Sequence, residues 1–111
     1  MVRGYVPEAG DIVWLHFDAQ VGHEQAGHRP AVVVSPSSYN GKTGLMWCCP
    51  MTTRIKGYPF EVLIAGRRPG AVLSDQIKSL DWAVRRASRK GRISPDELAE
   101  VRAKASALIG R

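Results

Sequence analysis

Four polar side chains that can bind a phosphate or move a proton lie within six residues of this sequence. They are Glu24, Gln25, His28 and Arg29. Pro30 and an apolar run at residues 31–34 follow at once, which predicts a polar loop that ends on a buried strand. An arginine held at the start of such a strand can bind two oxygens of one phosphate group, because its guanidinium is planar and forked. Such an edge can hold an arginine against a phosphate while the preceding loop closes over a substrate.

Cleavage of RNA without a metal is a reaction that suits these residue types. The 2′-hydroxyl attacks the adjacent phosphorus and the 5′-oxygen leaves, so the protein must remove one proton, supply another and stabilise the phosphoryl oxygens. We expect Arg29 to bind the phosphate and assist the leaving group, and Thr52 to donate a hydrogen bond to the same phosphate. Glu24 and His28 are the candidates for the base, and His28 for the acid, because a neutral arginine is energetically expensive.

Each of these residues also has a structural interpretation. Arg29 could form a salt bridge with Glu24 or Asp75. His28 could be a hydrogen-bonded structural histidine, and Glu24 could organise the loop instead of moving protons. Thr52 alone carries no signal, since threonines are common at strand ends. The catalytic interpretation depends on the joint occurrence of these residues in order.

Side chains elsewhere could bind RNA around the reacting phosphate. The candidates are Phe17, Gln25, Asn40, Arg54 and Lys56. Phe17, which precedes the polar loop, could stack on a base. The amides of Gln25 and Asn40 could read base edges, while Arg54 and Lys56 could follow the phosphate backbone. The basic run at residues 85–92 could bind RNA or form a solvated loop.

The charge balance favours a polyanionic partner. The 111 residues carry 16 Lys and Arg against 10 Asp and Glu, a net charge of +6. Nucleic acid or an acidic peptide would be attracted to such a protein. The length predicts one domain over residues 1–111. No metal-ligand cluster accompanies the polar motifs, so we expect neither a metal nor another cofactor.

The cysteines and the hydropathy pattern indicate a cytoplasmic protein. Cys48 and Cys49 are adjacent and would face opposite sides of a strand, so we expect both to be reduced and packed. The N-terminus lacks the apolar segment of a signal peptide. No window approaches the roughly 20 apolar residues of a membrane span, so we expect no membrane association.

The secondary-structure signals predict a mainly β protein with a C-terminal helix. We predict a loop at residues 18–29 and strands at residues 12–17, 31–34, 45–51, 60–64 and 71–73, with the third stopped at Pro50 and residues 76–82 continuing the sheet through a bulge. Residues 35–41 read as a turn with one short helical turn. Ser94, Pro95 and Glu97 form the start signal of a helix that ends at Gly110. A small curled barrel fits five or six such strands, although the pattern alone does not separate it from an OB-fold.

Several motifs together resemble those of the MazF/PemK-type toxins of bacterial toxin–antitoxin systems. They are the segment at residues 24–36, Thr52-Thr53, the run from Lys56 to Glu61, and Ser74-Asp75-Gln76. The resemblance covers roughly residues 5–110 and implies an SH3-like small barrel of the MazF/Kid/CcdB type. It also implies catalytic roles for Arg29 and Thr52. Residues 19–23 depart from the usual loop of the family, so the RNA sequence recognised is not predicted.

The function that the resemblance implies is a sequence-specific, ribosome-independent endoribonuclease, an mRNA interferase. It would cut single-stranded mRNA without metal and leave 2′,3′-cyclic phosphate and 5′-hydroxyl ends. The resemblance further implies a homodimer with the RNA channel near the subunit interface, and an antitoxin whose acidic, disordered C-terminal segment blocks that channel.

Two alternatives have the same shape and no catalysis. One is a gyrase-binding poison of the CcdB type, which needs a tryptophan in its C-terminal tail. This sequence ends Leu108-Ile109-Gly110-Arg111, which argues against it. The other is an interaction module of SH3 shape, which would have no use for Arg29, Thr52 and Glu24 together.

Overall fold

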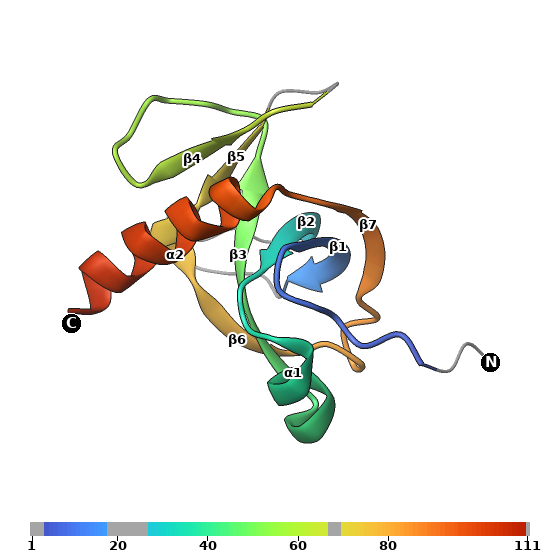
Figure 1. The fold of residues 1–111 in the computed structure, drawn as a ribbon. Helices are drawn as coiled ribbons and strands as arrows, with labels where there is room; N and C mark the ends of the chain where they lie inside the picture. Colours follow the sequence, from blue (N-terminus) through green and yellow to red (C-terminus); the bar gives the residue numbers. More distant parts are fainter. Residues whose placement is uncertain (1–3, 18–26, 67–69, 111) are drawn as a thin grey trace.

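A curled antiparallel sheet with one long helix across it forms the body of the molecule (Figure 1). The computed structural model describes residues 4–17, 27–66 and 70–110. Its strands are β1 (Asp11–Phe17), β2 (Gly27–Val33), β3 (Leu45–Thr52), β4 (Glu61–Ile64), β5 (Gly70–Leu73), β6 (Lys78–Asp81) and β7 (Ser88–Arg92). The helices are α1 (Ser37–Thr43), the 3-10 helix η1 (Ser74–Gln76) and α2 (Pro95–Ile109). The predicted mainly β fold with a C-terminal helix is confirmed.

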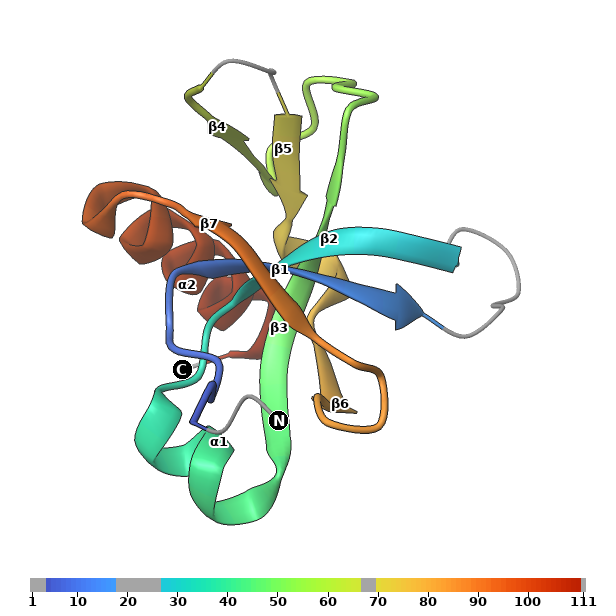
Figure 2. The same ribbon diagram turned by 90° about the vertical axis from the view of Figure 1, so that its right-hand side faces the viewer.

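Strand β3 is the centre of the sheet. One of its edges pairs with β2, and the other pairs with β6 near its start and with β5 near its end. The sheet continues from β2 to β1 and β7 on one side and from β5 to β4 on the other. Because β3 changes partner along its length, the strands cannot stay flat, and they curl into a half-barrel (Figure 2).

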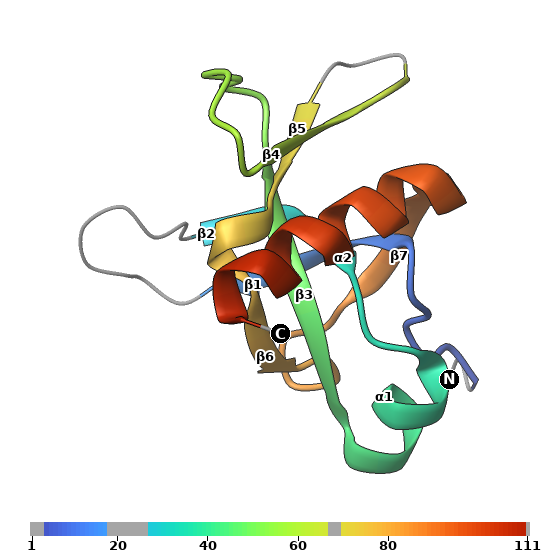
Figure 3. The same cartoon turned by 60° about the vertical axis from the view of Figure 1, so that its left-hand side comes forward.

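Two apolar clusters pack on opposite faces of β3. Met46 and Cys48 belong to the cluster inside the curl, together with Val13 and Leu15 of β1. Cys49 belongs to the cluster beneath α2, where Val101 of the helix is fully buried. Figure 3 shows α2 crossing the sheet over β3. The alternation of side chains along β3 therefore fixes both cores.

The cysteine prediction is confirmed. Cys48 and Cys49 are free, fully buried, and on opposite sides of the strand. Burial raises the pKa of each thiol to about 12. Both therefore stay protonated near neutral pH and behave as small apolar side chains.

Strand β2 begins earlier than the sequence indicates. The predicted loop at residues 18–29 is wrong over its last three residues, because Gly27, His28 and Arg29 pair with Phe17, His16 and Leu15 of β1. The start of β2 has a polar, glycine-containing sequence, because the paired strands β1 and β2 extend beyond the apolar cores. It therefore lacks the apolar pattern from which a strand is predicted. The consequence is that Arg29 is held by sheet pairing and not by a loop.

A seventh strand was also missed. Residues 88–92 lie in the basic run and form β7, which pairs with β1 through a bulge between Ile12 and Val13. Its arginines meet a buried carboxylate: Arg89 and Arg92 lie 3.5 and 3.6 Å from Asp11 Oδ1, and Tyr5 Oη donates to Asp11 Oδ2 at 3.0 Å. The strand is stabilised by charge, so its sequence lacks apolar alternation.

Two further predictions need correction. The segment after β2 forms a seven-residue helix, α1, instead of a single turn, and Gly44 ends it with a φ of 75°. Strand β3 runs through Pro50 to Thr52. Pro50 falls between the last residue paired with β6 and the first paired with β5, where a missing N–H is tolerated.

The predicted start of the C-terminal helix is confirmed. Ser94 and Glu97 form a reciprocal capping box, with Pro95 as the first helical residue. Among the described residues, no helix is long and apolar enough to cross a membrane.

Candidate active site

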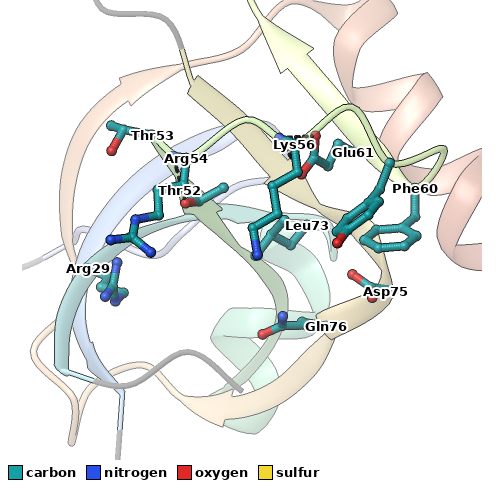
Figure 4. A pocket seen from close by; sticks show the side chains of 11 residues that line it. Arg29, Thr52, Thr53, Arg54, Lys56, Phe60, Glu61, Leu73, Asp75 and Gln76 are labelled. Atoms are coloured by element: carbon teal, nitrogen blue, oxygen red, sulfur yellow. Dashed lines mark hydrogen bonds between the residues drawn. The ribbon is translucent and has the colours of Figure 1, made fainter. Parts of the chain in front are cut away.

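A pocket of about 670 Å³ opens between the start of β2, the end of β3 and the segment that joins β3 to β4 (Figure 4). Its lining combines cationic, carboxylate, hydroxyl and aromatic side chains. They belong to Arg29, Thr52, Thr53, Arg54, Lys56, Tyr58, Phe60, Glu61, Leu73, Asp75 and Gln76. Four of the residues predicted for catalysis or RNA binding therefore lie together: Arg29, Thr52, Arg54 and Lys56.

Arg29 and Thr52 lie just beyond the paired part of β2 and β3. The ladder between these strands ends at Ala31 with Pro50, and each of the two site residues follows two positions further along its strand. Residues two positions apart in a strand share a face, so Arg29 and Thr52 lie on the faces of Ala31 and Pro50, and both line the pocket. The Thr52 hydroxyl oxygen accepts a hydrogen bond from the Arg54 N–H at 3.0 Å. Its own hydrogen can then be donated to a ligand oxygen in the pocket.

Three cations surround the open centre of the pocket. Figure 4 shows the Arg29 and Arg54 side chains at one end of the pocket, while the Lys56 side chain extends into the middle. The Lys56 ammonium also lies 5.8 Å from the centre of the Tyr58 ring. Planar guanidinium forks beside a threonine hydroxyl form a suitable site for phosphate oxygens.

Two carboxylates lie at the other end of the pocket. The Glu61 side chain accepts backbone hydrogen bonds from Lys56 and Gly57. The loss of solvent around the Asp75 carboxyl raises its pKa, and the negative charge of Glu61 raises it further, against an opposing backbone hydrogen bond. Asp75 therefore keeps its proton to a higher pH than an ordinary aspartate.

An aromatic pair completes the lining. The rings of Tyr58 and Phe60 lie 5.3 Å apart with their planes inclined at 34°. Exposed aromatic rings beside cations are typical of surfaces that bind single-stranded nucleic acid, because every base has a face that can stack. The motifs at residues 56–61 and 74–76 contain these residues. The sequence analysis assigned no individual role to Tyr58, Phe60, Glu61 or Gln76, and considered Asp75 only as a possible salt-bridge partner of Arg29. The sequence signal that could have identified this part of the surface is the two aromatic residues that follow Lys56.

Comparison with known proteins places the chain in a family. Residues 8–109 match the profile of the PemK-like, MazF-like toxins of type II toxin–antitoxin systems. The chain belongs to this toxin family. It is 54% identical over 111 residues to the endoribonuclease toxin MazF of Escherichia coli K12, an alignment that covers 99% of this chain and all of that protein.

Solved structures agree with this membership. MazF of Deinococcus radiodurans in crystal form I superposes with a TM-score of 0.91 at 54% identity, covering 97% of this chain and all of that one. A MazE–MazF structure from the same organism, form II, gives a TM-score of 0.86 at 54% identity and covers 96% of this chain and 98% of that one. The match confirms the barrel of the toxin family over the OB-fold alternative.

His28 lies outside the pocket. Successive side chains of a strand point to opposite faces, so His28 faces away from Arg29. Its ring is 4.6 Å from that of His16 and edge-on to Trp14 at 4.7 Å, and Lys90 lies over the Trp14 ring. This arrangement favours the structural interpretation of His28 over the general acid.

The basic run does not extend the pocket. Within it, Arg85 and Arg86 line a second cavity of about 410 Å³ beside His16. Arg89 and Arg92 pair with Asp11 instead. The cations of this run are therefore divided between a separate surface and a structural cluster.

Asn40 is also unsuited to its predicted role. Its side chain is fully buried in α1, where its Nδ2 donates to the carbonyl oxygens of Pro7 and Ser35 and its Oδ1 accepts from the Ser35 hydroxyl. No edge of the amide is left for a base, so Asn40 is removed from the RNA-binding set. Polar composition alone could not reveal a buried amide.

Three predicted residues remain without a structural outcome. Glu24 and Gln25 lie in the segment 18–26, outside the described residues. The backbone of Phe17 ends β1, and its side chain is likewise not described. Their roles stay predictions. Among the described residues, no group of three or more metal-ligating side chains comes together.

The adjacent residues His28 and Arg29 provide a matched test of this geometry. We predict that Arg29→Lys lowers the single-turnover rate of RNA cleavage, the activity for which the relatives are named, by at least about 100-fold, or roughly 3 kcal/mol. Lysine keeps the charge but loses the fork. His28→Gln should lower the rate less than about tenfold because it faces the other way. Equal losses in the two variants would contradict this assignment.

Proposed function

We propose that this chain is a sequence-specific, ribosome-independent endoribonuclease that cuts single-stranded mRNA in the pocket between the start of β2 and the end of β3. The observation that carries this proposal is that Arg29 and Thr52, just beyond the end of the β2–β3 ladder, line one pocket together with Arg54 and Lys56. The family and the names of the relatives support RNA cleavage. No observation favours a gyrase poison of the CcdB type.

In the proposed reaction, the scissile phosphate binds between Arg29 and Thr52. The guanidinium stabilises charge on the phosphoryl oxygens and assists departure of the 5′-oxygen, while the Thr52 hydroxyl donates a hydrogen bond. Arg54 and Lys56 bind the neighbouring phosphates, and the Tyr58–Phe60 pair offers faces for bases. All these groups line the same pocket.

The proton-transfer groups are carboxylates in this proposal. Glu24 remains the predicted base or loop organiser. Asp75, a carboxyl of the pocket lining, is a second candidate for proton transfer, because its raised pKa lets it carry a proton closer to neutral pH than an ordinary aspartate can. The residues then perform the whole reaction without a cofactor, with the 2′-hydroxyl as nucleophile.

The nature of the nucleophile can be tested by substrate chemistry. A single-stranded RNA should be cut in the presence of EDTA, and the products should carry a 2′,3′-cyclic phosphate and a 5′-hydroxyl. The same RNA with one 2′-deoxy sugar at the cut site should bind and resist cleavage. Mass spectrometry of the products decides the result, and rapid cleavage of the 2′-deoxy substrate would falsify the mechanism.

The proposed partners follow from charge and from the neighbouring structures. The solved neighbours include MazE–MazF complexes of Deinococcus radiodurans. We infer that this chain forms a homodimer in the cytoplasm, as one toxin domain over residues 1–111, and is neutralised by a cognate antitoxin. An acidic, disordered C-terminal segment of that antitoxin would suit a protein of charge +6 and a pocket that contains three cations.

We predict that the antitoxin segment competes with RNA for the pocket. Its affinity should fall as salt concentration rises, because part of the attraction is electrostatic, and its apolar side chains should supply the salt-independent remainder. A fluorescently labelled 2′-deoxy-substituted RNA, titrated with the segment, provides the measurement. A ternary complex at saturating concentrations of both would show that the segment does not cover Arg29 and Thr52.

A further inference from the structure

Glu61 occupies an unusual position for a negative charge. It is the first residue of β4, its side chain lines a pocket with three cations, and the residue is only 6% exposed. A carboxylate in an anion-binding pocket lowers the affinity for phosphate by repulsion. This unfavourable effect on phosphate binding raises the question of what the Glu61 side chain contributes to the pocket.

The carboxylate forms a clamp on the backbone of the pocket wall. Its two oxygens accept the Lys56 N–H at 3.2 and 3.3 Å, and Oε1 also accepts the Gly57 N–H at 2.9 Å (Figure 4). Hydrogen bonds to an ionised acceptor are stronger than neutral ones. Glu61 thus fixes two consecutive amides of a chain segment that has no strand or helix of its own.

The clamped segment carries two of the three pocket cations, Arg54 and Lys56. Residues 53–58 are all exposed and include Arg54, Lys56 and Tyr58 of the pocket lining. At one end of the segment, the Arg54 N–H donates a hydrogen bond to the Thr52 hydroxyl. At the other end, the Glu61 N–H donates to the Tyr58 carbonyl oxygen at 3.0 Å and closes a turn. Between these two hydrogen bonds, Gly57 has a φ of +82°, a left-handed conformation that glycine adopts without steric strain.

The clamp itself is anchored to the body of the protein. The backbone of Glu61 pairs with Leu73 of β5, and its carbonyl oxygen accepts a hydrogen bond from Lys104 of α2 at 2.9 Å. Lys104 is held in turn by Glu100, 3.2 Å away on the same helix. A side chain whose own backbone is fixed in this way can transmit the rigidity of the sheet and α2 to the segment.

We propose that Glu61 is a positioning residue, which holds residues 54–58 so that Arg54 and Lys56 face the RNA backbone. This inference rests on the proposed function. It separates Glu61 from a general base, because the carboxylate acts on amides of its own chain and not on the reacting atoms. The role predicts an effect on RNA affinity and little effect on the chemical step.

Substitution of Glu61 tests the clamp, with Glu97 as a matched control. Glu97 also accepts two backbone N–H groups, from Ala65 at 2.9 Å and Ser94 at 2.8 Å, and it is not part of the pocket lining. Glu61→Gln keeps one acceptor oxygen and nearly the same volume, and Glu61→Ala removes the clamp. The control variant is Glu97→Gln. Thermal denaturation of Glu61→Gln, Glu61→Ala and Glu97→Gln identifies any general loss of stability.

Three measurements are compared among the variants. In Glu61→Gln, the Lys56 and Gly57 amides should exchange hydrogen at least about tenfold faster. The Kd for RNA with a 2′-deoxy sugar at the cut site should rise about tenfold, while single-turnover cleavage at saturating RNA stays within about threefold of wild type. Glu61→Ala should show larger changes in the same direction. Glu97→Gln should leave amides 56 and 57 and the Kd unchanged.

The contradicting outcomes are separate for the two proposals. A loss of about 100-fold in the saturated rate of Glu61→Gln, with normal amide exchange and Kd, would make Glu61 a catalytic base. Unchanged exchange at residues 56 and 57 would overturn the clamp without any reference to RNA. Faster exchange with an unchanged Kd would show that the clamp does not position the cations. Wild-type protein that neither binds nor cuts RNA would contradict the proposed function instead.

Discussion

The antiparallel pairing of β2 with β3 is the interaction on which the candidate site depends. Its three matched pairs, Ala31 with Pro50, Val32 with Cys49 and Val33 with Cys48, consist entirely of buried residues that serve the two apolar cores in alternation. A slip of one residue would exchange the two faces and bury the wrong set of side chains. Because the cores fix this register, they also fix where the two strands continue to Arg29 and Thr52, each two positions beyond the last pair. The stability of the barrel and the geometry of the candidate site therefore depend on the same pairing.

The parts of the fold with apolar patterns could be predicted from the sequence, and the parts held by charge could not. The capping signals at Ser94 and Glu97 located α2 correctly, since they depend only on neighbouring residues. Strand β7 was missed because its arginines pair with Asp11, which lies far away in the sequence. The early start of β2 was missed because its first residues lie beyond the apolar core.

The candidate site was predictable where motif residues lie on neighbouring strands, as at Arg29 near the start of β2 and Thr52 at the end of β3. The structure favours a structural role for His28, because residue 28 belongs to a strand and therefore faces away from residue 29. Asn40 was misjudged because its partners, Pro7 and Ser35, are brought to it only by the tertiary fold. The properties of Glu61 and Asp75 became visible only in the folded pocket. There the Glu61 carboxylate accepts hydrogen bonds from backbone amides, and the pKa of Asp75 is raised.

The central claim is that one phosphate binds between Arg29 and Thr52, and a structure of the protein with bound RNA tests it most directly. The RNA should carry a single 2′-deoxy sugar at the cut site, so that the complex stays intact during crystallisation. The account predicts that oxygens of the scissile phosphate lie about 2.7–3.2 Å from the Arg29 guanidinium and the Thr52 hydroxyl. A scissile phosphate bound instead in the cavity beside His16, Arg85 and Arg86, with the pocket at Arg29 empty, would contradict it.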